Sequence, residues 1–135
     1  MRRSITLALT LATLLLWAAP ALADSPHFVS ATATRSGDTL TVDFKIAGLG
    51  NEDQTVTLTA DAQCFNRGGN APRAENKGAV LASGTFSPKN GNITATLSGS
   101  AQTDPVCSPP MELRYANVTL TAEPAGETVT LPGVF

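Results

Sequence analysis

The residue types that could bind a ligand are concentrated in one short polar segment. Arg67, Arg73 and Lys77 place three cations within eleven residues, and Gly68-Gly69 carries backbone amides that could hold an anion. This combination favours recognition of a carboxylate, a phosphate or a protein partner. A structural role is the alternative, because glycine and asparagine are common turn residues and asparagine side chains satisfy backbone groups in loops. The candidate binding residues are Asn66, Arg67, Gly68, Gly69, Asn70, Arg73 and Lys77.

One cysteine borders this segment, and the other lies within a second irregular segment. In a small exported domain such a pair usually forms a disulfide, so Cys64 and Cys107 are predicted to bond and to close a loop of about 44 residues, worth roughly 4 kcal/mol. The bond would lie at the base of two segments without a strand pattern, Phe65–Lys77 and Ser100–Pro110. Long loops in compact domains commonly carry function. We therefore expect these two loops to form a contact face, although a structural Phe65–Lys77 loop stays an open alternative.

The usual catalytic constellations are incomplete in this chain. His27 is the only histidine, so Ser-His-Asp, Cys-His and histidine-rich zinc sites all lack parts. Glu52-Asp53, Glu75 and Asp104 could be paired carboxylates of a glycosidase, but adjacent acids in a turn are normally solvated, and aromatic platforms for a sugar are lacking. The acidic residues also do not have the spacing of a calcium loop. We expect no catalytic residues, no metal site, no cofactor and no enzyme activity.

Polar and apolar residues alternate through most of the chain beyond residue 27, and a period of two is typical of half-buried strands. The clearest case is Thr39–Ile46, where every second residue is apolar, and the same alternation points Cys64 inward. The predicted strands are Phe28–Thr34, Thr39–Ile46, Val56–Cys64, Gly78–Phe86, Asn92–Leu97, Glu112–Ala122 and Glu127–Leu131. About seven strands at these spacings predict an all-β fold, an immunoglobulin-like antiparallel β-sandwich with one disulfide.

Two short connections have the composition of hairpin turns. Residues 36–38 join the first two predicted strands, and residues 87–91 join Phe86 to Ile93 through an Asn-Gly pair, which supplies the positive φ angles of tight turns. In the sixth strand the apolar parity reverses, and a β-bulge near Tyr115 or Ala116 would reconcile the two halves.

The first 23 residues have the order of a cleavable signal peptide. Arg2 and Arg3 precede an apolar stretch, and an Ala-Leu-Ala site ends at Ala23. An uncleaved membrane anchor is the alternative, but it needs about 20 predominantly apolar residues, and this run is shorter and interrupted by threonines. We therefore expect cleavage after Ala23, and we expect residues 24–135 to form a single secreted domain.

Cleavage would also change the net charge and the number of large aromatic residues. The mature chain keeps seven basic and eleven acidic residues, a net charge of −4, and loses the only tryptophan. A mildly acidic surface without a basic run disfavours nucleic acid and anionic lipid as partners. The expected partner is an extracellular protein or a small molecule, with no membrane contact after cleavage. The residues do not indicate an oligomeric state.

Four motifs stand out along the mature region: Cys64-Phe65-Asn66-Arg67-Gly68-Gly69-Asn70-Ala71-Pro72, Asn76-Lys77, Asn90-Gly91 and Cys107-Ser108-Pro109-Pro110. In these motifs the chain resembles uncharacterised small secreted bacterial β-proteins. The resemblance extends over essentially the whole mature region. It implies export and a similar loop layout, and it supplies no activity and no site residues.

A looser similarity concerns the strand–turn segments Val42–Gly50 and Val56–Cys64. These are similar to segments of the neocarzinostatin-type apoproteins, which are secreted immunoglobulin-like sandwiches that hold an apolar chromophore in a cleft. That group has two disulfides, whereas this chain can form one. The residues therefore predict a non-catalytic secreted binding or surface-interaction module of unassigned ligand, and a carrier of an apolar small molecule is the alternative.

Overall fold

The computed structural model describes residues 25–66, 68, 75–101 and 107–135, with the backbone alone for 75–77. The expected signal peptide lies outside these residues. Within them the chain forms seven strands, and it holds no helix long and apolar enough to cross a membrane. The strands are β1 (His27–Ser36), β2 (Thr39–Ala47), β3 (Gln54–Phe65), β4 (Glu75–Phe86), β5 (Ile93–Gly99), β6 (Glu112–Glu123) and β7 (Glu127–Val134).

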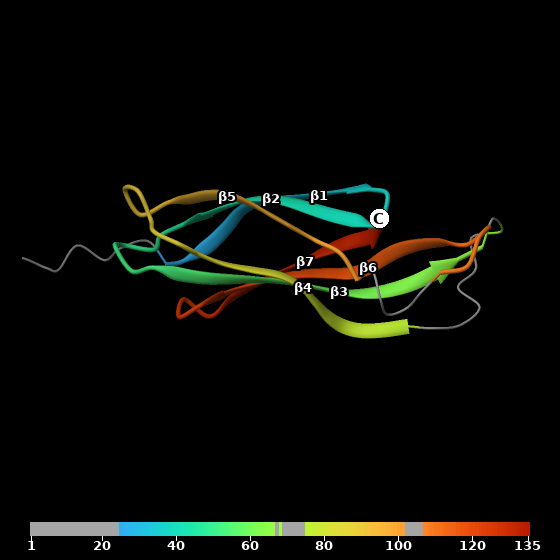
Figure 1. The fold of residues 1–135 in the computed structure, drawn as a ribbon. Helices are drawn as coiled ribbons and strands as arrows, with labels where there is room; N and C mark the ends of the chain where they lie inside the picture. Colours follow the sequence, from blue (N-terminus) through green and yellow to red (C-terminus); the bar gives the residue numbers. More distant parts are fainter. Residues whose placement is uncertain (1–24, 67, 69–74, 102–106) are drawn as a thin grey trace, which may run out of the picture.

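The seven strands make two antiparallel sheets that lie face to face (Figure 1). One sheet has the order β1-β2-β5, and the other has the order β4-β3-β6-β7. β1 and β2 form the predicted hairpin, in which Ser36 pairs with Thr39. The prediction of an all-β antiparallel sandwich of about seven strands with one disulfide is therefore confirmed.

The connection across residues 87–91 differs from the predicted hairpin. Its tight turn is present, because Lys89 and Asn92 exchange two backbone hydrogen bonds of 2.8 and 3.0 Å, and Asn90 and Gly91 have φ angles of 52° and 76°. However, β4 and β5 lie in different sheets, so the turn carries the chain across the sandwich. A turn depends on local residues, whereas the sheet that a strand joins depends on distant ones.

The strands around the expected binding loop extend further than predicted. Phe65 is the last residue of β3, and residues 75–77 belong to β4, so the predicted Phe65–Lys77 loop is shorter at both ends. Gln63 pairs with Glu75, and this pairing continues the two strands beyond their alternating apolar residues. These strands end where their backbone hydrogen bonds to a partner strand end. The pattern of side chains in the sequence does not show that position.

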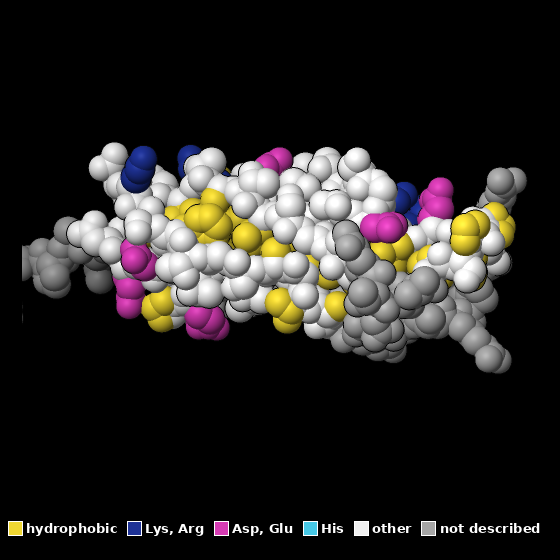
Figure 2. Space-filling model, in the orientation of Figure 1, with side chains coloured by type: hydrophobic (Ala, Val, Ile, Leu, Met, Phe, Trp, Pro, Cys, Tyr) yellow, Lys and Arg dark blue, Asp and Glu magenta, His cyan; other side chains and the backbone are white. Residues whose placement is uncertain are grey.

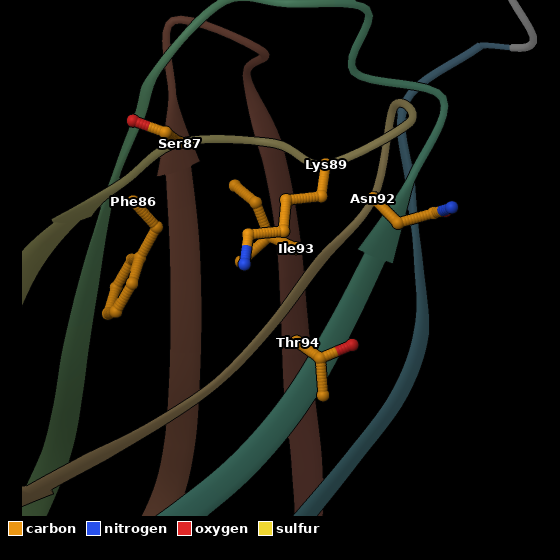
Figure 3. Close-up of a pocket in the computed structure, with 6 residues that line it drawn as sticks. All are labelled: Phe86, Ser87, Lys89, Asn92, Ile93 and Thr94. Atoms are coloured by element: carbon orange, nitrogen blue, oxygen red, sulfur yellow. The ribbon is translucent and has the colours of Figure 1, made fainter.

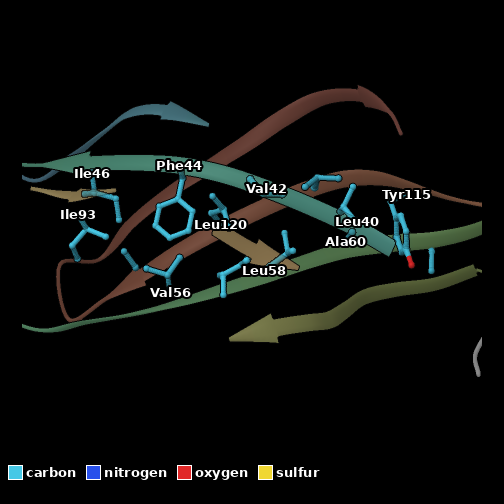
Figure 4. Close-up of a cluster of buried hydrophobic side chains, with 14 of the residues drawn as sticks. Leu40, Val42, Phe44, Ile46, Val56, Leu58, Ala60, Ile93, Tyr115 and Leu120 are labelled. Atoms are coloured by element: carbon cyan, nitrogen blue, oxygen red, sulfur yellow. The ribbon is translucent and has the colours of Figure 1, made fainter. Parts of the chain in front are cut away.

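The core lies between the sheets and follows the predicted alternation. β2 contributes inward side chains from Leu40 to Ile46, and β3 contributes Val56 and Leu58, all at most 2% exposed. Figure 4 shows the two sets pointing toward each other. Each fully buried Val, Leu, Ile or Phe side chain contributes about 1.5–3 kcal/mol, so this interlayer contact is the main stabiliser of the fold.

The outer face of the four-stranded sheet carries threonines in register across the strands. Thr55 lies 3.1 Å from Thr85 between hydroxyl oxygens, and Thr119 lies 3.1 Å from Thr130. These side chains alternate with the core residues, as the period of two requires. They are exposed or partly exposed, so they keep the sheet surface polar without adding charge.

The predicted bulge in β6 is present at Ala116 and Asn117. The register between β3 and β6 shifts here, and Asn117 has a φ of 50°. Its side-chain amide donates a 2.8 Å hydrogen bond to Oδ2 of Asp61, whose Oδ1 accepts a 2.8 Å bond from the backbone of Gly78. Asp61 therefore ties the irregular points of β4 and β6 to β3.

Tyr115 joins the two sheets near the same end of the sandwich. Its side chain is fully buried, and its hydroxyl donates a 2.6 Å hydrogen bond to the carbonyl of Asp38. The same oxygen accepts a 3.0 Å bond from the backbone amide of Ala101. One residue of β6 thereby holds the β1–β2 turn and the start of the β5–β6 connection in place.

Candidate functional site

The disulfide defines one end of the sandwich. Cys64 and Cys107 are bonded, with an S–S distance of 2.05 Å and a Cα–Cα distance of 5.4 Å, as the sequence predicted. The bond joins the end of β3 to the segment that precedes β6. Figure 1 shows the paired ends of β3 and β6 extending beyond the β1–β2 turn. We call this region the disulfide end.

The candidate binding loop is described only in part. The backbone amide of Gly68 donates a 3.0 Å hydrogen bond to Oδ1 of Asn66, which forms a turn of the kind that asparagine favours. Lys77 is in β4 by its backbone. Four of the predicted residues lie outside the described residues: Arg67, Gly69, Asn70 and Arg73. The structure therefore places the base of this loop at the disulfide end.

A charged cluster that was not predicted from the sequence lies at the same end. Glu112 and Arg114 are two residues apart in β6 and share a face of the sheet, and their side chains form an ion pair of 3.2 Å. Arg35 of β1 approaches the same carboxylate oxygen at 3.6 Å. Two guanidinium groups thus surround one carboxylate, so this Arg35–Glu112–Arg114 cluster keeps one net positive charge.

Arg114 also covers an aromatic ring. The centre of its guanidinium lies 5.8 Å from the centroid of Phe65, a distance at which a cation is attracted to the ring face. The side chain of Arg114 is 43% exposed, while its Nε is shielded from solvent and has no hydrogen-bond partner among the described residues. The result is a planar, charged and partly exposed surface held in one orientation.

The spacing of Glu112 and Arg114 could have suggested part of this cluster, because residues two apart in a strand share a face. The place of Arg35 in this cluster could not be predicted from spacing along one strand. Arg35 comes from the other sheet and is distant in sequence, so only the packing of the two layers brings it to Glu112.

A hollow lies at the opposite end of the sandwich. It has a volume of about 390 Å³ and is lined by Phe86, Ser87, Lys89, Asn92, Ile93 and Thr94. Figure 3 shows these residues around the β4–β5 connection. Figure 2 shows apolar side chains reaching the surface in a band between the two layers, on the side where this connection lies. The sequence predicts the turn here but gives no sign of a site.

The structure describes three of the residues considered for catalysis, which are His27, Glu52 and Asp53. His27 is exposed, and its Nδ1 lies 2.8 Å from the carbonyl oxygen of Ser25. Glu52 and Asp53 are exposed in the turn between β2 and β3. Asp104 and the side chain of Glu75 lie outside the described part of the chain. Within that part, no group of three or more His, Cys, Asp or Glu residues is arranged to hold a metal ion.

Comparison with known proteins gives no match, either to a protein-family model or to a curated protein. Two features of the described residues could therefore carry a function. One is the charged and aromatic surface at the disulfide end, formed by the cluster and Phe65. The other is the hollow beside Lys89.

Proposed function

We propose that this protein is an extracellular, non-catalytic binding module whose contact face is the disulfide end. The observation that carries the proposal is the ordered arrangement of Arg114 on the ring of Phe65 beside Glu112. Arginine and aromatic residues are enriched in the centres of protein interfaces. The net positive charge of the Arg35–Glu112–Arg114 cluster favours a protein partner that presents a carboxylate.

The arrangement contributes little to stability, which supports a role in contact. An exposed ion pair is worth about 0–1 kcal/mol, and an exposed cation–π contact is worth about 0.5–1 kcal/mol. Ordering the long side chain of Arg114 costs up to about 2 kcal/mol of rotamer freedom. Since these terms nearly cancel, fold stability alone does not explain an arginine held in this position.

The disulfide supports both the location and the site. Disulfides persist in oxidising compartments, so the Cys64–Cys107 bond is compatible with an extracellular location and with the expected signal peptide. The bond also limits the movement of the β3 end relative to the segment before β6. A contact face that is ordered before binding loses less entropy when its partner docks.

We also propose that the sandwich is immunoglobulin-like. In the constant-type immunoglobulin domain the first, second and fifth strands share one sheet, and the third, sixth and seventh share the other. The strands β1, β2 and β5 and the strands β3, β6 and β7 follow this division. β4 differs, because it pairs with β3 instead of β5. In immunoglobulin-like sandwiches the loops at the ends commonly carry the binding residues.

The experiment is a comparison of partner capture by the mature protein and by an Arg114→Ala variant. Both would be immobilised and exposed to the extracellular fraction of the producing organism, and captured polypeptides would be identified by mass spectrometry. We expect Arg114→Ala to keep its stability within about 1 kcal/mol and to lose the captured polypeptide. Lys45→Gln is the matched control, because it also removes a partly exposed cation from a strand.

Two results would contradict the contact function. One is equal capture by the mature protein and by the Arg114→Ala variant. The other is the absence of any captured polypeptide, including a second copy of this chain. Unfolding of Arg114→Ala would show that the cluster is structural.

A second candidate function is that of a small-molecule carrier, and one observation favours it. The hollow at the opposite end has a volume of about 390 Å³ and an apolar part formed by Phe86 and Ile93. Ligand sites commonly have volumes of about 300–1,000 Å³. The similarity to the neocarzinostatin-type apoproteins points to the same class of function. Binding of an apolar chromophore or drug-sized molecule to the mature protein would support it.

A further inference from the structure

The hollow at the β4–β5 connection has the features of a preformed ligand site. Its apolar floor consists of Phe86 and Ile93. The ring of Phe86 packs against Phe44 with 5.7 Å between centroids and an interplanar angle of 79°, and Ile93 is 4% exposed and pairs with Ile46 of β2. Because these side chains belong to the core, the floor keeps its shape without a ligand.

The wall of the hollow is also fixed. Lys89 begins the Asn90-Gly91 turn, which closes with two backbone hydrogen bonds between Lys89 and Asn92. The amide of Leu49 donates a further 3.0 Å bond to the carbonyl of Gly91, so the turn is held against the β2–β3 connection. The backbone of Lys89 is therefore anchored, and its side chain alone is free to adjust.

Lys89 places a positive charge over the apolar floor. In Figure 3 its side chain runs along Ile93, and its ammonium lies over the space between Ile93 and Phe86. No acidic side chain among the described residues forms an ion pair with it. The amide of Asn92 is engaged, because its Nδ2 donates a 3.2 Å hydrogen bond to the carbonyl of Asn90. Lys89 is thus the one cation of the lining residues.

We propose that this hollow binds a small monocarboxylate with an apolar body. The carboxylate would accept hydrogen bonds from the Lys89 ammonium, and the apolar body would lie on Phe86 and Ile93. One ammonium matches one negative charge, whereas a phosphate usually takes several cationic or amide donors. Ser87 and Thr94 also line the hollow, but Figure 3 shows their hydroxyls directed away from the Lys89 ammonium. This proposal rests on the second candidate function, for which it specifies the ligand, and it is independent of the proposed contact face at the other end of the sandwich.

The test compares octanoate, octanol and octylamine as ligands of the mature protein, followed by amide chemical shifts in NMR titrations. We expect saturable shifts for octanoate that centre on residues 86–94, weaker binding of octanol and the weakest binding of octylamine. Lys89→Gln should weaken octanoate binding about two- to fivefold, the range that an exposed ion pair provides, and leave octanol binding unchanged.

A second variant tests the floor without relying on charge. Phe86→Leu keeps an apolar side chain against Phe44, and we expect it to weaken octanoate and octanol binding together. The proposal is wrong if octanoate produces no saturable shifts, if the shifts centre on other residues, or if Lys89→Gln binds octanoate like the unmodified protein. Arg114→Ala should bind octanoate normally, so the outcome does not depend on the contact function.

Discussion

Tyr115 connects β6 to two other parts of the chain through one hydroxyl group. It lies in β6, donates to the carbonyl of Asp38 and accepts from the amide of Ala101. Replacement by phenylalanine keeps the buried ring but leaves both backbone groups without this partner. A part-buried group without its hydrogen bond costs about 1–3 kcal/mol. We predict that Tyr115→Phe lowers the free energy of unfolding by this amount, measured by urea denaturation.

Thr57→Val is the matched control for this variant. It also removes one hydroxyl that takes part in a hydrogen bond, since Thr57 lies 3.3 Å from Ser83, but it does so on the outer face of the sheet. Exposed substitutions of this kind change stability by at most about 0.5 kcal/mol. Equal effects of Tyr115→Phe and Thr57→Val would show that Tyr115 stabilises the protein by ring burial alone.

Gln54 shows what residue patterns alone could not predict. It is a polar residue with 1% exposure, its Oε1 accepts a 2.9 Å bond from the amide of Ala125, and its Nε2 donates a 3.2 Å bond to the carbonyl of Glu52. Burial of glutamine depends on these partners, which come from two different turns. The sequence shows a polar residue at the start of a strand and gives no reason to place it inside.

At the scale of elements, β4 and β5 approach closely at one point although they belong to different sheets. A Cβ atom on Gly99 of β5 would overlap with the carbonyl oxygen of Leu81 in β4. Backbone atoms cannot move aside as a flexible side chain does, so alanine would force the strands apart. We predict that Gly99→Ala destabilises the fold by about 1–3 kcal/mol or more, measured as a lower urea midpoint.

Ser98→Ala serves as the neighbouring control. Ser98 is exposed, and its hydroxyl lies 2.7 Å from that of Thr41 on the outer face. We expect a change within about 0.5 kcal/mol for this variant. If Gly99→Ala is as mild as Ser98→Ala, a side chain fits between β4 and β5, and the expected overlap with Leu81 is wrong.

Some properties of the strands could be predicted from the sequence, and others could not. Strand existence and inward faces followed from alternation, because a period of two is a local property of the backbone. The bulge near Ala116 followed from a break in the same pattern. The membership of β4 and β5 in different sheets did not follow, since it depends on the pairing of β4 with β3 and of β5 with β2.

At the scale of the whole molecule, the disulfide supplements a core with few aromatic residues. The bonded cysteines are 43 residues apart in sequence. In the chain-entropy description, a loop of this length stabilises the folded state by roughly 4 kcal/mol. We predict that replacing both cysteines by alanine lowers the free energy of unfolding by about 2–4 kcal/mol, measured by urea denaturation under non-reducing conditions. A loss below about 1 kcal/mol would contradict this role.

In the candidate site, only the disulfide could be predicted from the sequence, because two cysteines have a strong preference to bond with each other. Two cysteines in a small chain that is expected to be exported indicated the bond, and the bond indicated which end of the molecule to inspect. The Arg35–Glu112–Arg114 cluster requires the packing of two sheets, and the hollow requires the crossing of the β4–β5 connection between them. Both features depend on contacts between residues that are distant in sequence, which composition and spacing do not specify.

The contact function at the disulfide end is tested most directly by site-specific photocross-linking. A photoreactive phenylalanine analogue would replace Gln63, which pairs with Arg114 at this end, and in a separate variant Thr41 on the other sheet. Both proteins would be irradiated in the producer's extracellular fraction. We predict a cross-linked polypeptide from the Gln63 position that Arg114→Ala abolishes, and none from the Thr41 position. Equal cross-linking from both positions, or none from Gln63, would contradict the proposed contact face.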